Sequence, residues 1–363
     1  MSTDFGLIIG GKNLYSAGIK PLLAFAQGLL EKEFSVVLYL TGTNANSLKR
    51  IREKLYDYDK FKGIYSGDKI VEEFNSSTPS VIISDDYETR LKFSTKLVEK
   101  KSAKLCIYSQ VFGRLDLLTD IETGVPKSTQ DKKYETWKTF SKEHSKNLQK
   151  ANAVISNSYY TELNNLLLFG VSTNTVIYPP IDTKIFSYSR NSESKKITIY
   201  VGNEEEKAIY SITIISSLLK SGYKLRIFGS LKSIRDIKRS FDANEIEYMV
   251  SVDPETLHNA YVDSIITIVT PKWESFGNVP VESILSGTPA IAPNYQPWME
   301  LITDNTLYMI DRNFKALTEN TLIDAVTNYY NRIGIISEII RNKVSIDFST
   351  RSLINMLSQL NIL

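Results

Sequence analysis

Residues 264–289 hold the densest set of residue types that could do chemistry. The apolar run Ser264–Val269 predicts a buried strand, and Pro280 predicts the start of a helix. Proline suits the first helical position because its missing N–H would have had no partner there. The unpaired N–H groups of residues 276–279 would point out of the helix start, where the helix dipole also favours negative charge. This arrangement predicts a site for a phosphate-bearing ligand.

Two glutamates, Glu274 and Glu282, bracket the predicted helix start, and Glu282 falls in the first helical turn. A phosphate repels a carboxylate, so each glutamate needs another task, and accepting hydrogen bonds from sugar or ribose hydroxyls suits both. Acidic residues occupy 41 of 363 positions, so this spacing alone is weak evidence. The complete pattern is more restrictive and consists of Pro271, Glu274, Phe276-Gly277, Pro280, Glu282, Gly287 and Pro289.

Short apolar runs alternate with amphipathic stretches along the chain, which is typical of parallel strands joined by helices. The first series of expected strands is Phe5–Ile9, Ser35–Leu40, Ser80–Ser84, Lys104–Tyr108, Ala153–Ser156 and Thr175–Tyr178. The second series is Ile197–Val201, Lys224–Phe228, Glu247–Val250, Ser264–Val269 and Pro289–Ala292. Ligands of such α/β sheets bind at the carboxyl ends of the strands, where the loop before Pro280 lies.

A linker is expected between the two series, at Pro179-Pro180 and the polar stretch 187–196. We therefore expect two doubly wound, Rossmann-like domains facing each other across a cleft, with residues 1–184 in the first and 185–345 in the second. Helices are expected at 315–332, 334–343 and about 349–360. The last has an apolar stripe that must pack on something, formed by Leu353, Met356, Leu357 and Leu360.

Composition excludes several other classes of protein. The net charge is +2, from 43 Lys and Arg against 41 Asp and Glu, too balanced for a chain whose main partner is nucleic acid. The single cysteine, Cys106, lies in an apolar run, so we expect it to be buried in a protein of a reducing compartment. His144 and His258 form no zinc-ligand cluster, and no stretch approaches the ~18 apolar residues of a spanning helix. We expect an unsecreted, cytoplasmic protein without a metal.

The segment Glu274–Glu282 is similar to the signature of the retaining glycosyltransferases of family 4, which have the GT-B fold. Their two glutamates, with seven residues between them that include Phe-Gly, match it, and their following Gly-x-Pro matches Gly287-Thr-Pro289. The resemblance covers most of the chain, with Asn157–Asp182, including Val176–Asp182, similar to the family's interdomain connection and Gly10-Gly11 to its glycine-rich loop. It implies that 346–363 forms a helix that crosses back to the first domain.

The resemblance implies transfer of a hexose from a nucleotide diphosphate sugar with retention at the anomeric carbon, using neither a metal nor a cofactor besides this donor substrate. Glu274 would hold the sugar hydroxyls near the reacting carbon, and Glu282 the ribose hydroxyls. The loop 10–18 has no His, Asp or Glu, and hence no base for an inverting reaction. The other donor-binding residues implied in this way are Gly10, Gly11, Gly229, Val250, Ser251, Phe276, Gly277, Asn278 and Val279.

Two departures from the family concern the cations that stabilise the leaving diphosphate. Family members commonly have Val-Gly-Arg after the first strand of the donor domain, and a lysine five residues beyond the arginine. This chain has Asn203 in place of the arginine, and its Lys207 comes one residue early. Because Asn203 carries no charge, we expect Lys272 and Lys207 to supply it, the alternative for each being a surface lysine without a ligand role.

Acceptor contacts are expected from the first domain, at Asp85, Tyr108 and Gln110. Asp85-Asp86 follow a predicted strand and would face the cleft, with capping of a helix over 87–100 as the alternative. Tyr108 to Gln110 stand where the family often has a histidine. The acceptor itself, a glycan, a lipid-linked or a protein acceptor, stays open.

The segment 130–150 is the most basic part of the chain, since together with Lys127 it has seven lysines against three acidic residues, 7 − 3 = +4. A solvated helix face is the favoured interpretation, and attraction to an anionic acceptor or to the inner membrane face through Lys127–Lys150 is the alternative. His144, like His258, is expected to pack within a helix. Trp137 and Phe140 either belong to the core or hold an acceptor sugar.

Other functions stay open beside the leading hypothesis. A nucleotide-sugar epimerase would need acid and base side chains on both faces of the sugar, and none is evident. A non-catalytic nucleotide-sugar-binding protein is motivated by Asn203. A dinucleotide oxidoreductase is least favoured because Gly10-Gly11 lacks the rest of Gly-x-Gly-x-x-Gly. The donor is expected to be of the GDP-mannose or UDP-glucose type.

Overall fold

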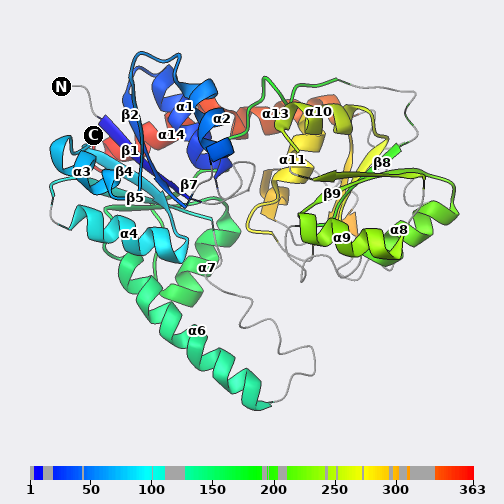
Figure 1. Cartoon of the computed structure of the whole chain (residues 1–363), viewed down its shortest axis with the longest axis horizontal. Coiled ribbons are helices and arrows are strands. Elements are labelled where there is room, and N and C mark those ends of the chain that lie inside the picture. The colour runs from blue at the N-terminus through cyan, green and yellow to red at the C-terminus, as the bar shows by residue number, and fades with distance from the viewer. Residues whose placement is uncertain are drawn as a thin grey trace. The chain divides into compact units, whose positions relative to one another are not determined.

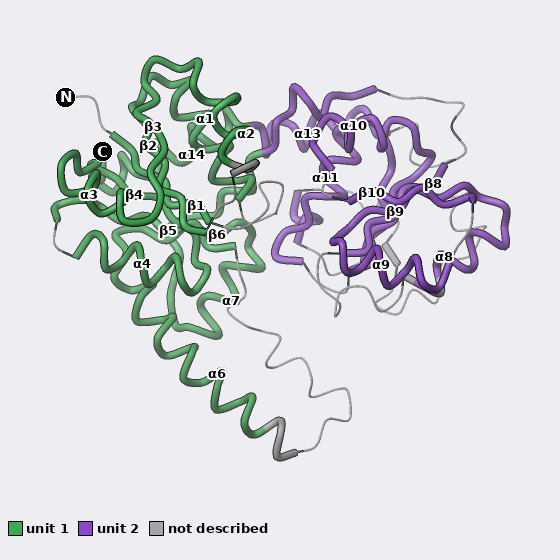
Figure 2. Tube along the Cα trace, viewed as in Figure 1, with its two compact units in different colours: residues 1–180, 346–363 green, residues 181–345 purple. Residues whose placement is uncertain are grey.

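The computed structural model describes residues 4–10, 19–42, 45–99, 101–110, 127–189, 194, 196–202, 211–241, 244–250, 252–271, 274–293, 297–301, 309–310 and 332–363. The chain divides into two compact units (Figure 2). Unit 1 comprises residues 1–180 and 346–363, and unit 2 comprises residues 181–345.

Unit 1 is built on a seven-stranded sheet in the order β3-β2-β1-β4-β5-β6-β7, in which all neighbours run parallel. Its strands are β1 (Asp4–Gly10), β2 (Ser35–Thr41), β3 (Phe61–Ser66), β4 (Val81–Asp85), β5 (Lys104–Ser109), β6 (Ala153–Ser156) and β7 (Thr175–Val176). Its helices are α1 (Lys20–Glu31), α2 (Ala45–Leu55), α3 (Lys69–Ser76), α4 (Glu88–Val98), α6 (Lys127–Leu148), α7 (Tyr159–Phe169) and α14 (Ile346–Gln359). The central strands are buried along almost their whole length because helices cover both faces of the sheet (Figure 1).

Unit 2 has a six-stranded parallel sheet in the order β10-β9-β8-β11-β12-β13. Its strands are β8 (Lys196–Tyr200), β9 (Lys224–Gly229), β10 (Ile246–Val250), β11 (Ile266–Val269), β12 (Ala290–Pro293) and β13 (Met309–Ile310). Its helices are α8 (Ser211–Lys220), α9 (Leu231–Ser240), α10 (Pro254–Val262), α11 (Asn278–Leu285), the 3₁₀ helix η3 (Pro297–Leu301) and α13 (Ile333–Val344).

Every predicted strand overlaps a strand of one of these sheets, which confirms the α/β prediction. Two strands were not predicted. The first, β3, is a half-buried edge strand with Lys62 and Gly63 in its middle, so its apolar signal is weak. The second, β13, has two residues. The expected helix at 315–332 lies outside the described residues, apart from Arg332.

The final helix α14 packs on α1 in unit 1. Leu353, Met356 and Leu357 are buried in the cluster that includes the β1 and β2 side chains, as their helical spacing predicts. Leu360 does not follow the prediction: it is 38% exposed because the helix ends at Gln359. Close contact between the helices depends on Gly28, where a Cβ atom would overlap the side chain of Thr350.

Cys106 is fully buried on β5, and burial raises the pKa of its thiol to about 12, so the prediction of a packing role is confirmed. Within the described ranges, none of the helices has the length and apolar character needed to cross a membrane.

Candidate functional site

The carboxyl ends of four neighbouring strands meet at one edge of the unit 2 sheet. Val250 at the end of β10 pairs with Gly229 at the end of β9. The Ser230 N–H donates to the Gly202 carbonyl just beyond β8, at 3.1 Å. The Thr270 hydroxyl, after β11, donates to the Tyr200 carbonyl at 3.0 Å. The predicted positions Gly229 and Val250 are thus brought to the edge from which the loop before α11 leaves.

Gly229 allows two of these strand ends to approach closely. A Cβ atom there would lie 2.7 Å from the carbonyl oxygen of Gly202 and 2.8 Å from Val201 Cγ2. Any side chain would therefore separate β8 from β9 at the edge where ligands of parallel sheets bind. Val250 is 38% exposed, so it lies at the surface of the unit.

The helix α11 begins two residues earlier than expected. Gly277 is its N-cap, with φ 99° and ψ 71°, a left-handed conformation that favours glycine. Asn278 is the first helical residue, so Pro280 is the third, and Glu282 is beyond the first turn, in which no acidic residue lies. The prediction for Pro280 and Glu282 was wrong because the first four helical N–H groups all lack partners, so proline is tolerated at each of these positions. The amides of residues 277–279 still lie at the helix start, where Asn278 and Val279 are partly exposed.

The loop before α11 is fixed on one side by a backbone hydrogen bond between two buried residues. Phe276 and Trp298 are each 1% exposed, and the backbone N–H of Trp298 donates to the Phe276 carbonyl at 2.7 Å. Among the described residues, the side-chain oxygen of Asn278 is a buried acceptor with no hydrogen-bond partner. An acceptor in this state at a helix start suits a ligand hydroxyl.

The two glutamates differ in environment. Glu274 is partly buried in the loop. Glu282 is 2% exposed, and its Oε2 accepts a hydrogen bond of 3.4 Å from the Tyr261 hydroxyl of α10. Burial raises the pKa of Tyr261 well above its usual value, and the charge of Glu282 raises it further, so this hydroxyl stays a donor. An ionised carboxylate has about four acceptor positions, so Glu282 has capacity for further donors.

His258 joins α10 to the end of α11, as expected of a packing residue. Its Nδ1 lies 3.0 Å from the Ser286 hydroxyl, and burial lowers its pKa.

The segment Gly287-Thr-Pro289 follows α11 and ends the helix with a tight turn. Gly287 has φ +94°, and its N–H donates to the Ile284 carbonyl at 3.0 Å. A Cβ atom at Gly287 would lie 2.6 Å from the carbonyl oxygen of Ser189, whose own N–H donates to the Ser286 carbonyl at 3.1 Å. The glycine therefore serves both a left-handed turn and a close backbone contact.

Replacing Gly287→Ala is expected to destabilise unit 2 by at least about 1–3 kcal/mol, because a left-handed non-glycine residue costs that much and the methyl group also meets Ser189. Gly222→Ala is the matched control, since Gly222 has φ +80° but nothing within 4 Å of its Cβ position. The loss of stability in each variant is measured by urea unfolding, with hydrogen exchange of the α11 amides as the probe of unit 2. Equal losses in the two variants would contradict the contact with Ser189.

In unit 1, Gly10 ends β1 beside a buried arginine. A Cβ atom there would overlap the Thr41 hydroxyl and lie 2.8 Å from Arg90 Cδ and Nη1. Arg90 is held in place by Asp85, since its Nε and Nη2 donate to the two carboxylate oxygens at 2.6 and 2.7 Å. Burial raises the pKa of Asp85, and Arg90 opposes this. Sequence reasoning did not identify Arg90, although its place five residues after Asp85 on a predicted helix was a usable signal.

The other acceptor candidates lie in internal contacts of unit 1. Asp86, 1% exposed, accepts from the Ser109 hydroxyl at 2.6 Å and from the Gln110 N–H at 3.0 Å. Tyr108 is fully buried and its hydroxyl donates to the Ile177 carbonyl at 3.0 Å, so it presents no surface to an acceptor. Neither aspartate caps α4, whose N-cap is Tyr87, without a side-chain cap bond. The predicted residues Gly11, Asn203, Lys207, Ser251 and Lys272 lie outside the described residues.

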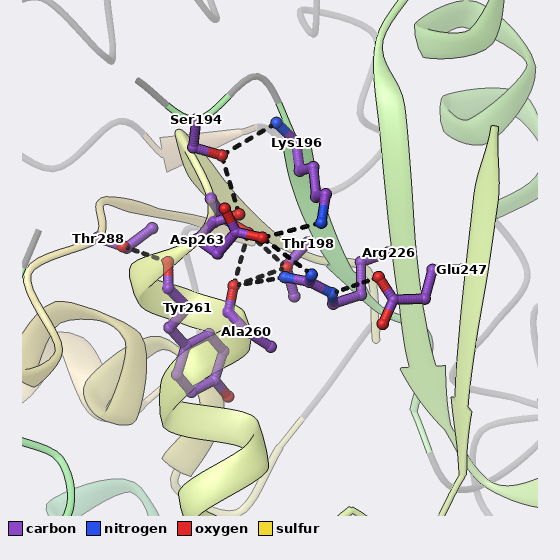
Figure 3. A network of polar contacts seen from close by, with 10 residues as sticks. Ser194, Lys196, Thr198, Arg226, Glu247, Ala260, Tyr261, Asp263 and Thr288 are labelled. Carbon is purple, nitrogen blue, oxygen red and sulfur yellow. Dashed lines mark hydrogen bonds and ion pairs between the residues drawn. The ribbon is translucent and has the colours of Figure 1, made fainter. Parts of the chain in front are cut away.

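A charged network lies at the opposite, amino end of the unit 2 sheet (Figure 3). Arg226, 6% exposed, donates to Glu247 at 3.0 Å, to Asp263 at 3.1 Å and to the Ala260 carbonyl at 2.9 Å. Asp263 also pairs with Lys196 at 2.9 Å. This network connects β8, β9 and β10 to the end of α10 and lies away from the carboxyl edge of the sheet. Within the described ranges, no group of three or more His, Cys, Asp and Glu residues could hold a metal ion.

The geometry of unit 2 is matched by a protein family. Residues 182–332 match the family model described as "Glycosyl transferases group 1". This part of the sequence is therefore similar to a glycosyltransferase domain, in agreement with the predicted class of enzyme. An uncharacterized 41.2 kDa protein in the cps region of Klebsiella pneumoniae is 28% identical over 175 residues, 45% of this chain and 48% of the relative. The match thus spans about half the length of that relative.

Solved structures resemble the whole chain. HepE from Anabaena, in complex with UDP and glucose, has a TM-score of 0.77 at 12% identity, covering 98% of this chain and 99% of that one. Sucrose-phosphate synthase from Thermosynechococcus elongatus has a TM-score of 0.74 at 15% identity, covering 99% of each chain. A glycosyltransferase from Rickettsia africae has a TM-score of 0.72 at 14% identity, covering 99% of each. These similarities show the fold and confirm the predicted GT-B architecture of two Rossmann-like units.

Proposed function

We propose that the chain is a retaining, metal-independent glycosyltransferase that moves a hexose from a nucleotide diphosphate sugar to an acceptor hydroxyl. The observation that carries this proposal is the start of α11 at the carboxyl edge of the unit 2 sheet. There a left-handed Gly277 precedes the first helical amides, Asn278 offers a buried oxygen, and Glu274 and Glu282 lie on either side in sequence. The match of residues 182–332 to the glycosyl transferases group 1 model supports it.

In this proposal the amides at the start of α11 bind the donor phosphates, because the helix dipole and unpaired N–H groups both favour an anion. Glu274 accepts hydrogen bonds from the sugar, and Glu282 from the ribose. The main chain at Val250 and Ser251 meets the base, beside Gly229. Lys207 and Lys272 supply the positive charge that Asn203 does not, while Gly10 and Gly11 admit the diphosphate to the loop after β1.

Retention follows from a reaction on one face of the sugar. The acceptor oxygen bonds to the anomeric carbon while the bond from that carbon to the diphosphate oxygen breaks, and the departing oxygen takes the acceptor proton. No protein base is needed, in keeping with a loop 10–18 that contains no His, Asp or Glu. The amides and cations around the diphosphate then stabilise the charge that develops on it.

A UDP-glucose type of donor is favoured over GDP-mannose, since HepE was crystallised with UDP and glucose and shares the fold. The acceptor is proposed to bind to unit 1. The exposed lysines of α6, including Lys138, Lys142 and Lys146, fit a solvated face and equally an attraction to an anionic membrane surface from the cytoplasmic side.

Incubating the protein with UDP-glucose and GDP-mannose in the presence of EDTA tests the proposal. We expect release of UDP, and of glucose with the α configuration when water is the acceptor, measured by NMR. Nucleotide binding without release would establish the non-catalytic alternative, and conversion of UDP-glucose into another UDP-hexose would establish the epimerase.

A further inference from the structure

A groove between α4 and α6 in unit 1 is not used by the donor. Its volume is about 340 Å³, and it is lined by Glu88, Thr136, Thr139, Phe140 and Glu143. The two helices lie side by side (Figure 1), where the Thr95 hydroxyl donates to Asn147 at 3.4 Å. A cavity of about 10 Å³ at its base shares three of these residues and also contacts Leu91, Lys92, His144 and Asn147. That space is close to what one water molecule needs.

His144 lines this small cavity with its hydrogen-bonding groups unused. The side chain is 2% exposed, and neither ring nitrogen has a hydrogen-bond partner among the described residues. Its ring packs against Phe140 and Phe169, with centroids 5.1 and 4.6 Å apart. Burial lowers the pKa of His144 to about 4, so near neutral pH the ring has one N–H donor and one nitrogen acceptor. Buried polar atoms in this state indicate a partner that binds in the groove.

The charges of the groove favour a neutral ligand. Lys92 donates to Glu88 at 3.1 Å and to Glu143 at 3.0 Å, so its ammonium occupies the position that a cationic ligand would take. Two carboxylates against one lysine leave a net negative charge, which disfavours an anion. The side chains of Glu88 and Glu143 are 40% and 53% exposed, so lone pairs remain for hydroxyl donors. Phe140 adds an apolar face for polarised C–H groups. A pyranose ring fits such a groove, because it is uncharged, its hydroxyls donate hydrogen bonds, and its C–H groups can contact an aromatic face.

The groove also lies where an acceptor is expected. Glu88 is the first residue of α4, which follows the carboxyl end of β4, and ligands of parallel sheets bind at this edge. The ion pair of Lys92 with Glu143 and the hydrogen bond of Thr95 with Asn147 show that α4 and α6 run parallel. The first turns of α6, which precede Thr136, therefore continue past the start of α4 at Glu88.

We propose that this groove binds a neutral sugar residue of the acceptor, with Glu88 and Glu143 accepting its hydroxyls, Phe140 contacting one face, and His144 bonding it directly or through one water. This proposal rests on the proposed glycosyltransferase function, and it specifies that the acceptor is a saccharide. His144, which the sequence assigns to packing, is then part of a binding site, and Phe140 holds an acceptor sugar, which is one of its two sequence-based interpretations.

Histidine NMR on the full chain tests this directly. The chain has two histidines, so labelling with ¹³C-histidine gives two ring signals, assigned with His258→Gln. The probes are methyl α-D-glucopyranoside, methyl β-D-galactopyranoside, methyl α-D-mannopyranoside, glucose 6-phosphate and inorganic phosphate. We expect at least one methyl glycoside to shift the His144 signal saturably, without moving His258 in unit 2. Glucose 6-phosphate should bind more weakly than methyl glucoside, and phosphate should have no effect.

Variants of the groove establish where the sugar binds. Glu88→Gln and Glu143→Gln should each weaken the glycoside about five- to tenfold, because a charge-assisted hydrogen bond becomes a neutral one. Glu135→Gln is the matched control, an exposed carboxylate on the same helix that pairs with Lys138 at 3.7 Å. An unmoved His144 signal with every glycoside, tighter binding of the phosphorylated sugar, or an equal loss with Glu135→Gln would overturn the proposal.

The two proposals can fail separately. Release of UDP from UDP-glucose by the wild-type protein without saccharide tests the transferase function. The His144 shift without donor tests the groove. Donor turnover with no glycoside bound to the groove would reject the groove alone, while glycoside binding without turnover would leave a saccharide site on a protein that is not a transferase.

Discussion

Glu274→Gln is expected to lower kcat for hexose transfer at least about 100-fold and to leave UDP affinity nearly unchanged. The reason is that the proposed role of Glu274 concerns the sugar and not the nucleotide. A hydrogen bond or charge that acts mainly in the transition state is worth about two to three orders of magnitude in kcat. Gln keeps the size of the side chain and removes its charge, so folding should be unaffected. Single-turnover rates with UDP-glucose and calorimetry with UDP measure the two quantities.

Glu338→Gln is the matched control for this variant. Glu338 is an exposed glutamate of α13 in the same unit, with 67% side-chain exposure and an ion pair with Arg341 at 3.9 Å. It should keep wild-type rates. Full activity of Glu274→Gln would show that the carboxylate has no part in transfer. A loss of UDP affinity as large as the loss of rate would show that Glu274 stabilises the conformation of the loop and does not act on the sugar.

The sequence predicted the sheets well because parallel strands buried on both faces are nearly continuous apolar runs. Val81–Asp85 and Ile266–Val269 are of this kind, with all residues of each strand buried. The half-exposed edge strand Phe61–Ser66 was not predicted, because a strand that is not buried on both faces has no continuous apolar run. The start of α11 was placed two residues late because proline marks the first turn of a helix and not its first residue.

Side-chain partners were harder to predict than elements, since they depend on contacts between distant residues. Nothing in the local sequence shows that Tyr108 reaches the Ile177 carbonyl, 69 residues away, or that Arg226 meets Asp263. His144 was correctly placed on a helix and correctly expected to be buried. Among the described residues, its ring nitrogens have no hydrogen-bond partner, which only the packing of α4, α6 and α7 reveals.

Arg226→Met is expected to destabilise unit 2 by about 2–4 kcal/mol. Removing one member of a buried ion pair costs about 3–5 kcal/mol when the partner's charge stays buried. Here the cost is lower because Asp263 is 37% exposed and keeps Lys196 at 2.9 Å. The Ala260 carbonyl loses a donor as well, and methionine keeps most of the packing of the arginine stem. Glu247→Gln removes a 53% exposed partner of the same guanidinium and should cost less than about 1 kcal/mol.

The same network predicts how acid affects unit 2. Burial alone would raise the pKa of Asp263, but hydrogen bonds and charge from Lys196 and Arg226 outweigh it and lower the pKa below 3.8. A depressed folded-state pKa gives stability that is present above the unfolded value and is lost as pH falls through the folded value. In the wild-type protein, the stabilisation of unit 2 by ionised Asp263 should therefore be lost only below pH 3.8. In Arg226→Met this stabilisation should be smaller, so the loss of stability on acidification should be smaller too.

Hydrogen exchange of the β8 and β9 amides follows unit 2 separately from unit 1, whose β1 and β2 amides serve as the internal reference. If Arg226→Met and Glu247→Gln changed β9 protection equally, the buried contacts with Asp263 and Ala260 would not be what stabilises this end of the sheet. Because the network lies at the amino end of the strands, UDP affinity measured well below the unfolding transition should be unchanged in both variants. A loss of UDP affinity with intact protection would show that the two ends of the sheet are coupled.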